Sequence, residues 1–172
     1  MRNEETVKYL NIMIESLEKK TSLLEQLHKK TLLQSECIAG KDSDDANWEQ
    51  FDVLIVEKDS LIERIDELDT GFDNVFNRIK FEVEANKEDY KDEIHKLQAL
   101  IGTLTDTGVK IGAAEERNRK DVDRIMTAVK AGIGKARKNM KASSGYIASM
   151  YGNQAAFDST KIDSKRFTLR AE

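Results

Sequence analysis

The sequence has 172 residues, enough for about one domain, and its hydrophobic share of 39% lies below the roughly 45–50% of a compact globular chain. It contains no proline, and 35% of its residues are charged, which favours long helices with solvated faces around a thin core. The net charge of −4 argues against a dedicated nucleic-acid binder. The sequence contains no run of about eighteen apolar residues, so it predicts no membrane span. One cysteine and two histidines exclude a disulfide framework and the usual zinc sites, so we expect neither a metal nor a cofactor.

A heptad pattern marks the first helix. One seam position holds Val7, Ile14, Thr21, His28 and Ser35, and the other holds Leu10, Leu17, Leu24, Thr31 and Ile38. Met13, Leu23 and Leu27 widen the apolar stripe, so we expect this helix to pack against two neighbours. Gly40 is a plausible C-terminal cap, and the short polar segment 41–46 predicts an antiparallel second helix.

The second helix is predicted to begin at Asn47, with Gln50 in the reciprocal position of a capping box. Its apolar stripe has the strongest helical spacing in the chain: Phe51, Leu54, Ile55, Leu61, Ile62, Ile65, Leu68, Phe72, Val75, Phe76, Ile79 and Val83. Gly71 lies inside this stripe, where we expect a bend or a close helix contact rather than an end.

A third helix is predicted to follow, and two readings of its start are open. Asn86 with Asp89 can cap a new helix, or the second helix runs on unbroken. Weak helix formers gather around Gly108, and every residue from Glu115 to Asp121 is charged or Asn118. Either neighbouring helices hold this stretch, or it frays.

These elements predict an all-α fold, an elongated antiparallel bundle of three long helices with coiled-coil packing over residues 1–142. The last segment, 143–172, is expected to be flexible or short-helical, partly disordered when free, and able to bind a partner through its scattered apolar residues. Met1 to Glu5 shows no apolar signal-peptide core, so we expect a cytoplasmic protein.

Charge is unevenly distributed along the chain. Residues 41–95 contain 18 acids and 7 bases, a net of −11, whereas residues 115–141 contain 4 acids and 9 bases, a net of +5. These segments either pair with each other in the bundle or steer oppositely charged partners. No constellation of nucleophile and base stands out, and carboxylates occur on every predicted helix face, so the sequence predicts a binding protein rather than an enzyme.

Three stretches of the sequence resemble the FlgN-type flagellar export chaperones of Gram-positive bacteria. They are Glu57 to Asp69 (EKDSLIERIDELD), Glu115 to Asn118 (EERN), and a tail with Tyr146, Phe157-Asp158 and Ile162 to Arg166 (IDSKR). The similarity is one of layout over nearly the whole chain. It implies a cytoplasmic chaperone of the flagellar type III secretion system that binds hook-associated proteins, keeps them soluble and delivers them for export.

By the layout of that family, the region from Lys130 to Phe167 would bind the client. The expected apolar anchors are Val129, Ile133, Met140, Ile147, Met150 and Tyr151, and the expected charge partners are Lys135, Arg137 and Lys138. The spacing between Phe157 and Ile162 is looser than the family pattern. The partners implied are hook-associated proteins and components of the export apparatus, with no nucleic acid and no membrane, for a monomer or homodimer.

Two other functions fit the same patterns. Heptad continuity also suits a coiled-coil structural or scaffold protein without a dedicated client, although the glycines at positions 40, 71 and 108 favour a closed bundle. The related chaperone of the filament cap protein differs in its client rather than in its architecture.

Overall fold

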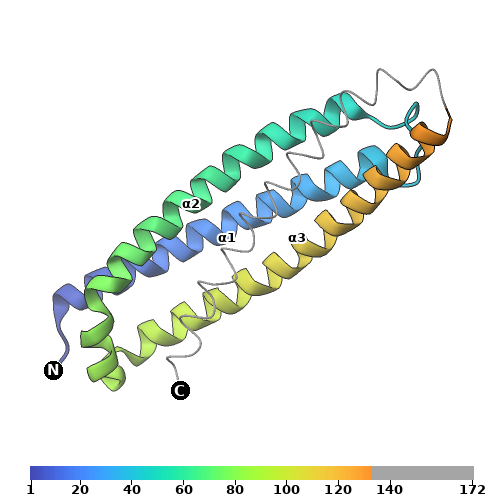
Figure 1. Cartoon of the computed structure of the whole chain (residues 1–172). Helices are drawn as coiled ribbons and strands as arrows, with labels where there is room; N and C mark the ends of the chain where they lie inside the picture. The colour runs from blue at the N-terminus through green and yellow to red at the C-terminus, as the bar shows by residue number, and fades with distance from the viewer. Residues whose placement is uncertain (133–172) are drawn as a thin grey trace.

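Three long helices make up the computed structural model, which describes residues 1–132. They are α1 (Glu4–Ile38), α2 (Trp48–Ala85) and α3 (Lys91–Ala131), and a single 3₁₀ turn, η1 (Lys87–Tyr90), joins α2 to α3. The helices contain 35, 38 and 41 residues, so each is roughly 50–60 Å long. The prediction of an all-α bundle of three long helices is confirmed for the described residues (Figure 1). The predicted boundary at residue 142 and the tail 143–172 lie outside them.

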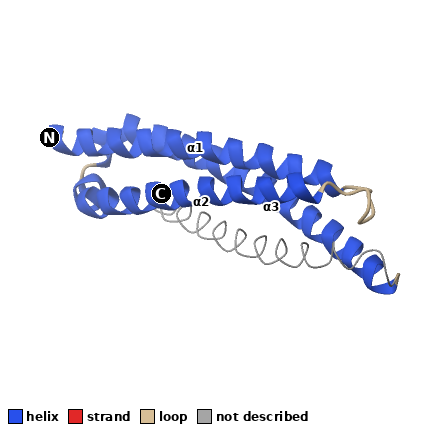
Figure 2. Ribbon diagram, turned by 90° about the horizontal axis from the view of Figure 1, so that it is seen from above, coloured by secondary structure: helices blue, strands red, loops and turns tan. Residues whose placement is uncertain are grey.

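The middle element of the bundle is α1. Both α2 and α3 pack along its length, whereas the backbones of α2 and α3 come close to each other at hardly any point within the described residues. In the second view, α1 runs along one side of the molecule, and α2 and α3 lie on the other side (Figure 2). The prediction that the first helix has two neighbours is therefore confirmed, and its wide apolar stripe is the physical reason.

The loop between α1 and α2 follows the sequence prediction closely. Gly40 takes the left-handed conformation, with φ of 66°, that favours glycine after a helix end. The side chain of Asn47 caps α2 by accepting a hydrogen bond from the Gln50 amide at 3.1 Å. The Asn47 amide donates to the Cys37 carbonyl at 3.0 Å and not to the Gln50 side chain, so the reciprocal half of the predicted capping box is wrong, and this bond links the first two helices instead.

The connection between α2 and α3 corrects one prediction. The chain does break near Asn86, but Asn86 closes α2 instead of capping α3: its amide and its side chain both donate to the Glu82 carbonyl, at 3.2 Å each. No side-chain cap precedes η1 or α3. The Asp89 carboxylate, which in one of the two readings helps Asn86 to cap a new helix, instead accepts from the N-terminal ammonium at 3.0 Å.

The structure also bears on two glycine predictions. The second helix continues through Gly71, as expected, and a Cβ at this position would meet open space, so the alternative of a close helix contact is wrong and the alternative of a bend stays a prediction. The third helix also continues through the glycines around position 108. Its charged stretch from Glu115 to Asp121 is held by neighbouring helices, because Glu115 and Asn118 are buried.

The apolar interior consists of two separate clusters. The main core fills the part of the bundle nearer the N-terminus and η1, and contains Leu10, Met13, Ile14, Leu17, Leu23, Leu24, Leu27, Leu61, Ile65, Phe72, Ile79, Tyr90, Leu97, Ile101, Leu104 and Ile111. The loop-end core lies beside the α1–α2 loop and contains Cys37, Ile38, Trp48, Phe51, Leu54, Ile55, Val122, Ile125 and Val129. Each cluster draws side chains from all three helices.

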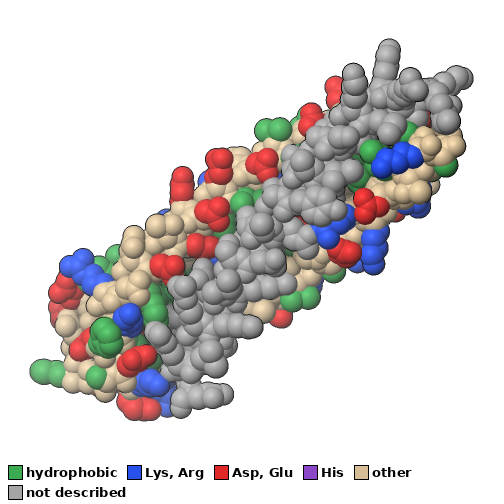
Figure 3. Space-filling model, viewed as in Figure 1, with side chains coloured by type: hydrophobic (Ala, Val, Ile, Leu, Met, Phe, Trp, Pro, Cys, Tyr) green, Lys and Arg blue, Asp and Glu red, His purple; other side chains and the backbone are tan. Residues whose placement is uncertain are grey.

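Charged side chains are spread over the described surface of the bundle. Acidic residues dominate α2, and several of them line its outer edge in the space-filling view (Figure 3). Exposed ion pairs such as Lys30–Glu57, at 2.7 Å, occur between neighbouring helices. This polar covering is what the high charged fraction predicted.

Candidate binding surface and buried polar layer

Among the predicted partner-binding residues, only Val129 lies within the described part of the chain. Its side chain is buried in the loop-end core, in the last turns of α3. Ile133, Lys135, Arg137, Lys138, Met140, Ile147, Met150 and Tyr151 lie outside the described residues. Val129 therefore contacts the bundle itself in this conformation, and a partner could reach it only if the end of α3 moved.

A groove runs along the outer side of the α1–α2 pair. One stretch of it has a volume of about 330 Å³, and a second, adjoining stretch has about 260 Å³. Both stretches share Lys19, Glu67 and Leu68, so they form one continuous depression from Ile12 to Gln26 of α1. This span of α1 is roughly 21 Å long at 1.5 Å per residue.

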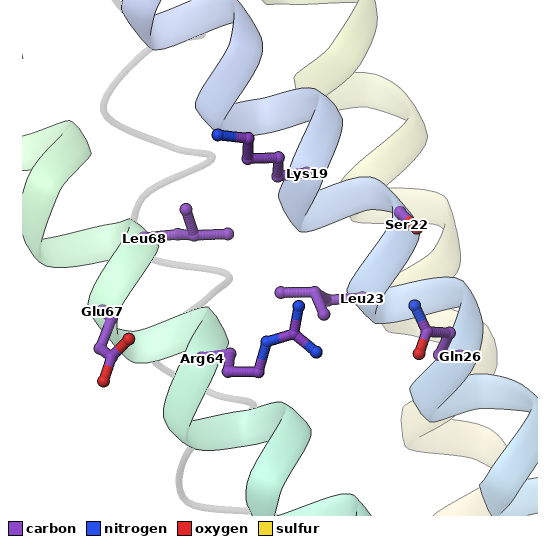
Figure 4. A pocket seen from close by; sticks show the side chains of 7 residues that line it. All are labelled: Lys19, Ser22, Leu23, Gln26, Arg64, Glu67 and Leu68. Atoms are coloured by element: carbon purple, nitrogen blue, oxygen red, sulfur yellow. The ribbon is translucent and has the colours of Figure 1, made fainter.

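The groove combines an apolar floor with a charged rim. Leu23 and Leu68 point toward each other from α1 and α2, and the guanidinium of Arg64 extends between the two helices (Figure 4). Lys19 and Arg64 supply positive charge, while Glu15 and Glu67 supply negative charge. The lining also includes three small residues, Ser16, Ser22 and Gly71, whose side chains fill little of the groove.

Exposed apolar side chains extend this surface beyond the groove. Ile12, at one end of the groove, is 49% exposed. Toward the α1–α2 loop, Leu33 of α1 and Val53 and Val56 of α2 are also exposed, near the Lys30–Glu57 ion pair. Apolar contacts flanked by both signs of charge are the features with which an amphipathic helix is recognised.

A layer of polar side chains lies inside the bundle between the two apolar clusters. Lys58 of α2 is fully buried, and its ammonium forms an ion pair with Glu115 of α3 and donates to the Gln34 side chain of α1 at 2.7 Å. The Gln34 amide in turn donates to the Phe51 carbonyl at 3.4 Å. Lys58 thus connects all three helices at one level.

The α1–α3 side of the same layer is equally polar. The Thr31 hydroxyl lies 3.3 Å from Glu115, and Asn118 donates to the Thr31 carbonyl at 3.1 Å. Ser35 donates to the Asn118 side-chain oxygen at 2.5 Å. One carboxylate oxygen of Glu115, Oε2, is buried and has no hydrogen-bond partner among residues 1–132. The layer therefore contains a charge that is only partly compensated.

The electrostatics of the layer follow from its burial. Removal from water lowers the pKa of the Lys58 ammonium below the ordinary lysine value of 10.5, and the Glu115 carboxylate opposes this effect. At the nearby Cys37, burial raises the pKa of the thiol above 9.0. Both groups belong to the interior rather than to an accessible reactive site.

Sequence reasoning gave Lys58 no structural role, and it left open whether neighbouring helices hold the stretch that contains Glu115 and Asn118. A signal was present, because the apolar stripe of the second helix skips position 58 between Ile55 and Leu61, where helical spacing calls for a buried residue. The third helix shows the same gap between Ile111 and Val122, at positions 115 and 118. Polar residues at apolar positions of a stripe indicate a buried polar layer.

Residues 1–132 contain no group of three or more His, Cys, Asp and Glu side chains arranged to hold a metal ion. No helix in the described part of the chain is long and apolar enough to cross a membrane. Comparisons with protein-family models, curated proteins and solved structures give no match to this chain.

Proposed function

We propose that the protein is a cytoplasmic chaperone of the flagellar type III export system that binds hook-associated proteins, keeps them soluble and delivers them for secretion. The proposal rests on the resemblance of the chain's layout to the FlgN-type chaperones, and it is supported by the all-α bundle that this resemblance implies. A client with an exposed amphipathic helix needs a complementary apolar surface until it is exported.

The observation that supports this function best is the groove along α1 and α2. Its floor of Leu23 and Leu68, with the exposed Ile12 at one end, suits apolar side chains spaced one helical turn apart. Lys19 and Arg64 can pair with acidic residues of the client helix, and Glu15 and Glu67 with basic ones. A client helix of roughly four turns would cover the groove.

The predicted contacts from Val129 to Tyr151 form the second part of the proposal. The basic side chains Lys135, Arg137 and Lys138 would pair with acidic residues of the client, and the apolar anchors would order on binding. A client held by both the tail and the groove would meet basic side chains in the tail and both signs of charge in the groove. Binding in the micromolar to nanomolar range would permit release at the export apparatus.

The proposal is tested by affinity capture of the tagged full-length chain from its native cytoplasm, with co-purifying proteins identified by mass spectrometry. We expect hook-associated proteins, and we expect their loss from a chain that ends at Ser143. Recovery of only the chain itself, unchanged by this truncation, would contradict the proposal and favour a self-associating scaffold. Capture of the filament cap protein instead would place the chain with the related chaperone type.

A matched pair of surface variants tests the groove. Ile12→Lys places a charge at the apolar end of the groove, whereas Val109→Lys makes the same kind of change on α3, where Val109 is 58% exposed and does not line the groove. Both variants should fold normally, because both side chains are exposed. We expect Ile12→Lys to weaken client binding about tenfold or more and Val109→Lys to leave it unchanged. Equal affinities for the two variants would remove the groove from the binding site.

A further inference from the structure

The buried polar layer separates the two apolar cores at the same level on all three helices. On α1 it lies between Leu27 of the main core and Cys37 of the loop-end core. On α2, Lys58 lies between Ile55 and Leu61, and on α3 the pair Glu115 and Asn118 lies between Ile111 and Val122. Within the described residues, no buried apolar side chain is shared by the two clusters, so they are two separate cores.

We infer that this layer divides the bundle into two units that unfold separately. The loop-end unit, residues 36–57 and 119–131, opens while the main core stays folded. Cooperative unfolding depends on continuous apolar packing, which the layer interrupts. Polar groups of the layer can exchange protein hydrogen bonds for bonds to water when the loop end opens, so a break at this level exposes less apolar surface than a break elsewhere. The Glu115 oxygen that lacks a partner within the described part of the chain can accept a hydrogen bond from water in that step.

The loop-end unit is also the smaller of the two. It contains nine buried apolar residues, whereas the main core contains sixteen. Polar contacts attach it to the loop: Arg124 donates to the Lys41 carbonyl at 3.0 Å, and the Trp48 indole donates to the Ser43 carbonyl at 3.2 Å. Opening would expose Val129 together with Trp48 and Phe51, and would make this predicted client anchor accessible. The inference concerns the free protein and holds independently of the proposed client.

The chain contains two natural probes of this unit, because its single cysteine, Cys37, and its single tryptophan, Trp48, both lie in the loop-end core. Under native conditions, a thiol reagent reacts with buried Cys37 only through opened molecules. The matched control is the double variant Cys37→Ser with Leu97→Cys, which places the only thiol in the main core, where Leu97 is fully buried. Truncation of Leu97 weakens the main core and can only reduce the difference between the two sites.

In full-length protein, Cys37 should react at least about tenfold faster than the thiol of the control, which corresponds to 1.4 kcal/mol in opening free energy. Its reaction should also depend less on denaturant than global unfolding does. Equal rates, or a Cys37 rate that follows global unfolding, would overturn the inference. Fluorescence of Trp48 should change at a lower denaturant concentration than helical circular dichroism, and coincident transitions would likewise count against two units.

Amide hydrogen exchange distinguishes unit opening from fraying of one helix end. Segments 48–57 and 119–131 should exchange with a common opening free energy, lower than that of segments 61–79 and 97–111. Rapid exchange limited to the last turn of α1 would show fraying and reject the unit. A third variant, Gln34→Leu with Lys58→Met and Glu115→Leu, replaces the layer by apolar side chains and should slow Cys37 labelling toward the rate of global unfolding.

Discussion

The main core and the loop-end core are built from the same three helices, yet they differ in what surrounds them. The main core is a long apolar seam, in which α1 contributes seven of its buried residues, and it stays continuous past the buried Lys20 that pairs with Asp69. The loop-end core is short and bounded on one side by the polar layer of Lys58 and Glu115 and on the other by the α1–α2 loop. Stability is therefore expected to be uneven along the rod, because apolar burial is the principal stabilising term.

The largest effect is expected where the two regions meet. Lys58→Met leaves the Glu115 carboxylate buried without its ion-pair partner, and should lower the free energy of unfolding by about 3–5 kcal/mol. Urea unfolding followed by circular dichroism measures this change. The matched surface change, Lys30→Met, breaks the exposed pair with Glu57 and should cost less than about 1 kcal/mol.

The double variant Lys58→Met with Glu115→Leu sharpens this test. Because it removes both charges, it should recover most of the stability that the single variant loses. A single variant as stable as wild type would mean that water reaches Glu115, and the layer would then not be a buried boundary.

Truncation of one leucine in each core compares the two regions directly. Leu24 in the main core and Leu54 in the loop-end core are each 1% exposed, so Leu24→Ala and Leu54→Ala should both lower the free energy of unfolding, by about 2–5 kcal/mol. If the units open separately, Leu54→Ala should accelerate native-state labelling of Cys37, whereas Leu24→Ala should leave that rate nearly unchanged. Equal acceleration by both variants would indicate one cooperative unit.

The sequence was sufficient for the architecture because each helix carries a regular apolar stripe and clear signals at the α1–α2 loop. Gly40 adopts the left-handed conformation, and Asn47 caps the second helix, as their residue types predict. Both features depend only on residues close in the sequence. Asn86 shows the limit of such reasoning: the same residue can end one helix or begin the next, and only the packing of Tyr90 and the N-terminal segment around η1 selects the first.

The buried polar layer and the candidate binding surface were less predictable than the fold. Lys58 and Glu115 stood out only as gaps in stripes, and their pairing depends on the register between α2 and α3, which a single sequence does not contain. Val129 continued an apolar stripe toward the tail, so it resembled an anchor for a partner, but α1 and α2 bury it in the loop-end core. The α1–α2 groove depends on the distance between two helices and has no local signature.

The smallest effect expected is a pH dependence that arises in the polar layer. Burial holds the pKa of Lys58 below 10.5, so between its folded value and 10.5 the unfolded chain binds more protons at this site than the folded chain does. Stability from this site should therefore rise with pH in that window, by at most about 1.4 kcal/mol per pH unit for one proton, and should not vary at lower pH.

The difference in unfolding free energy between wild type and Lys58→Met, followed from neutral pH to about pH 10, isolates this contribution. The raised pKa of Cys37 acts in the opposite direction above 9.0, because the unfolded thiol ionises first, but both proteins contain Cys37 and its contribution cancels in the difference. A difference that stays flat would mean that attraction to Glu115 fully offsets the desolvation of Lys58. In that case the charged form of Lys58 would be as stable in the layer as in water. The boundary between the two cores would then have to be explained by the interruption of apolar packing alone.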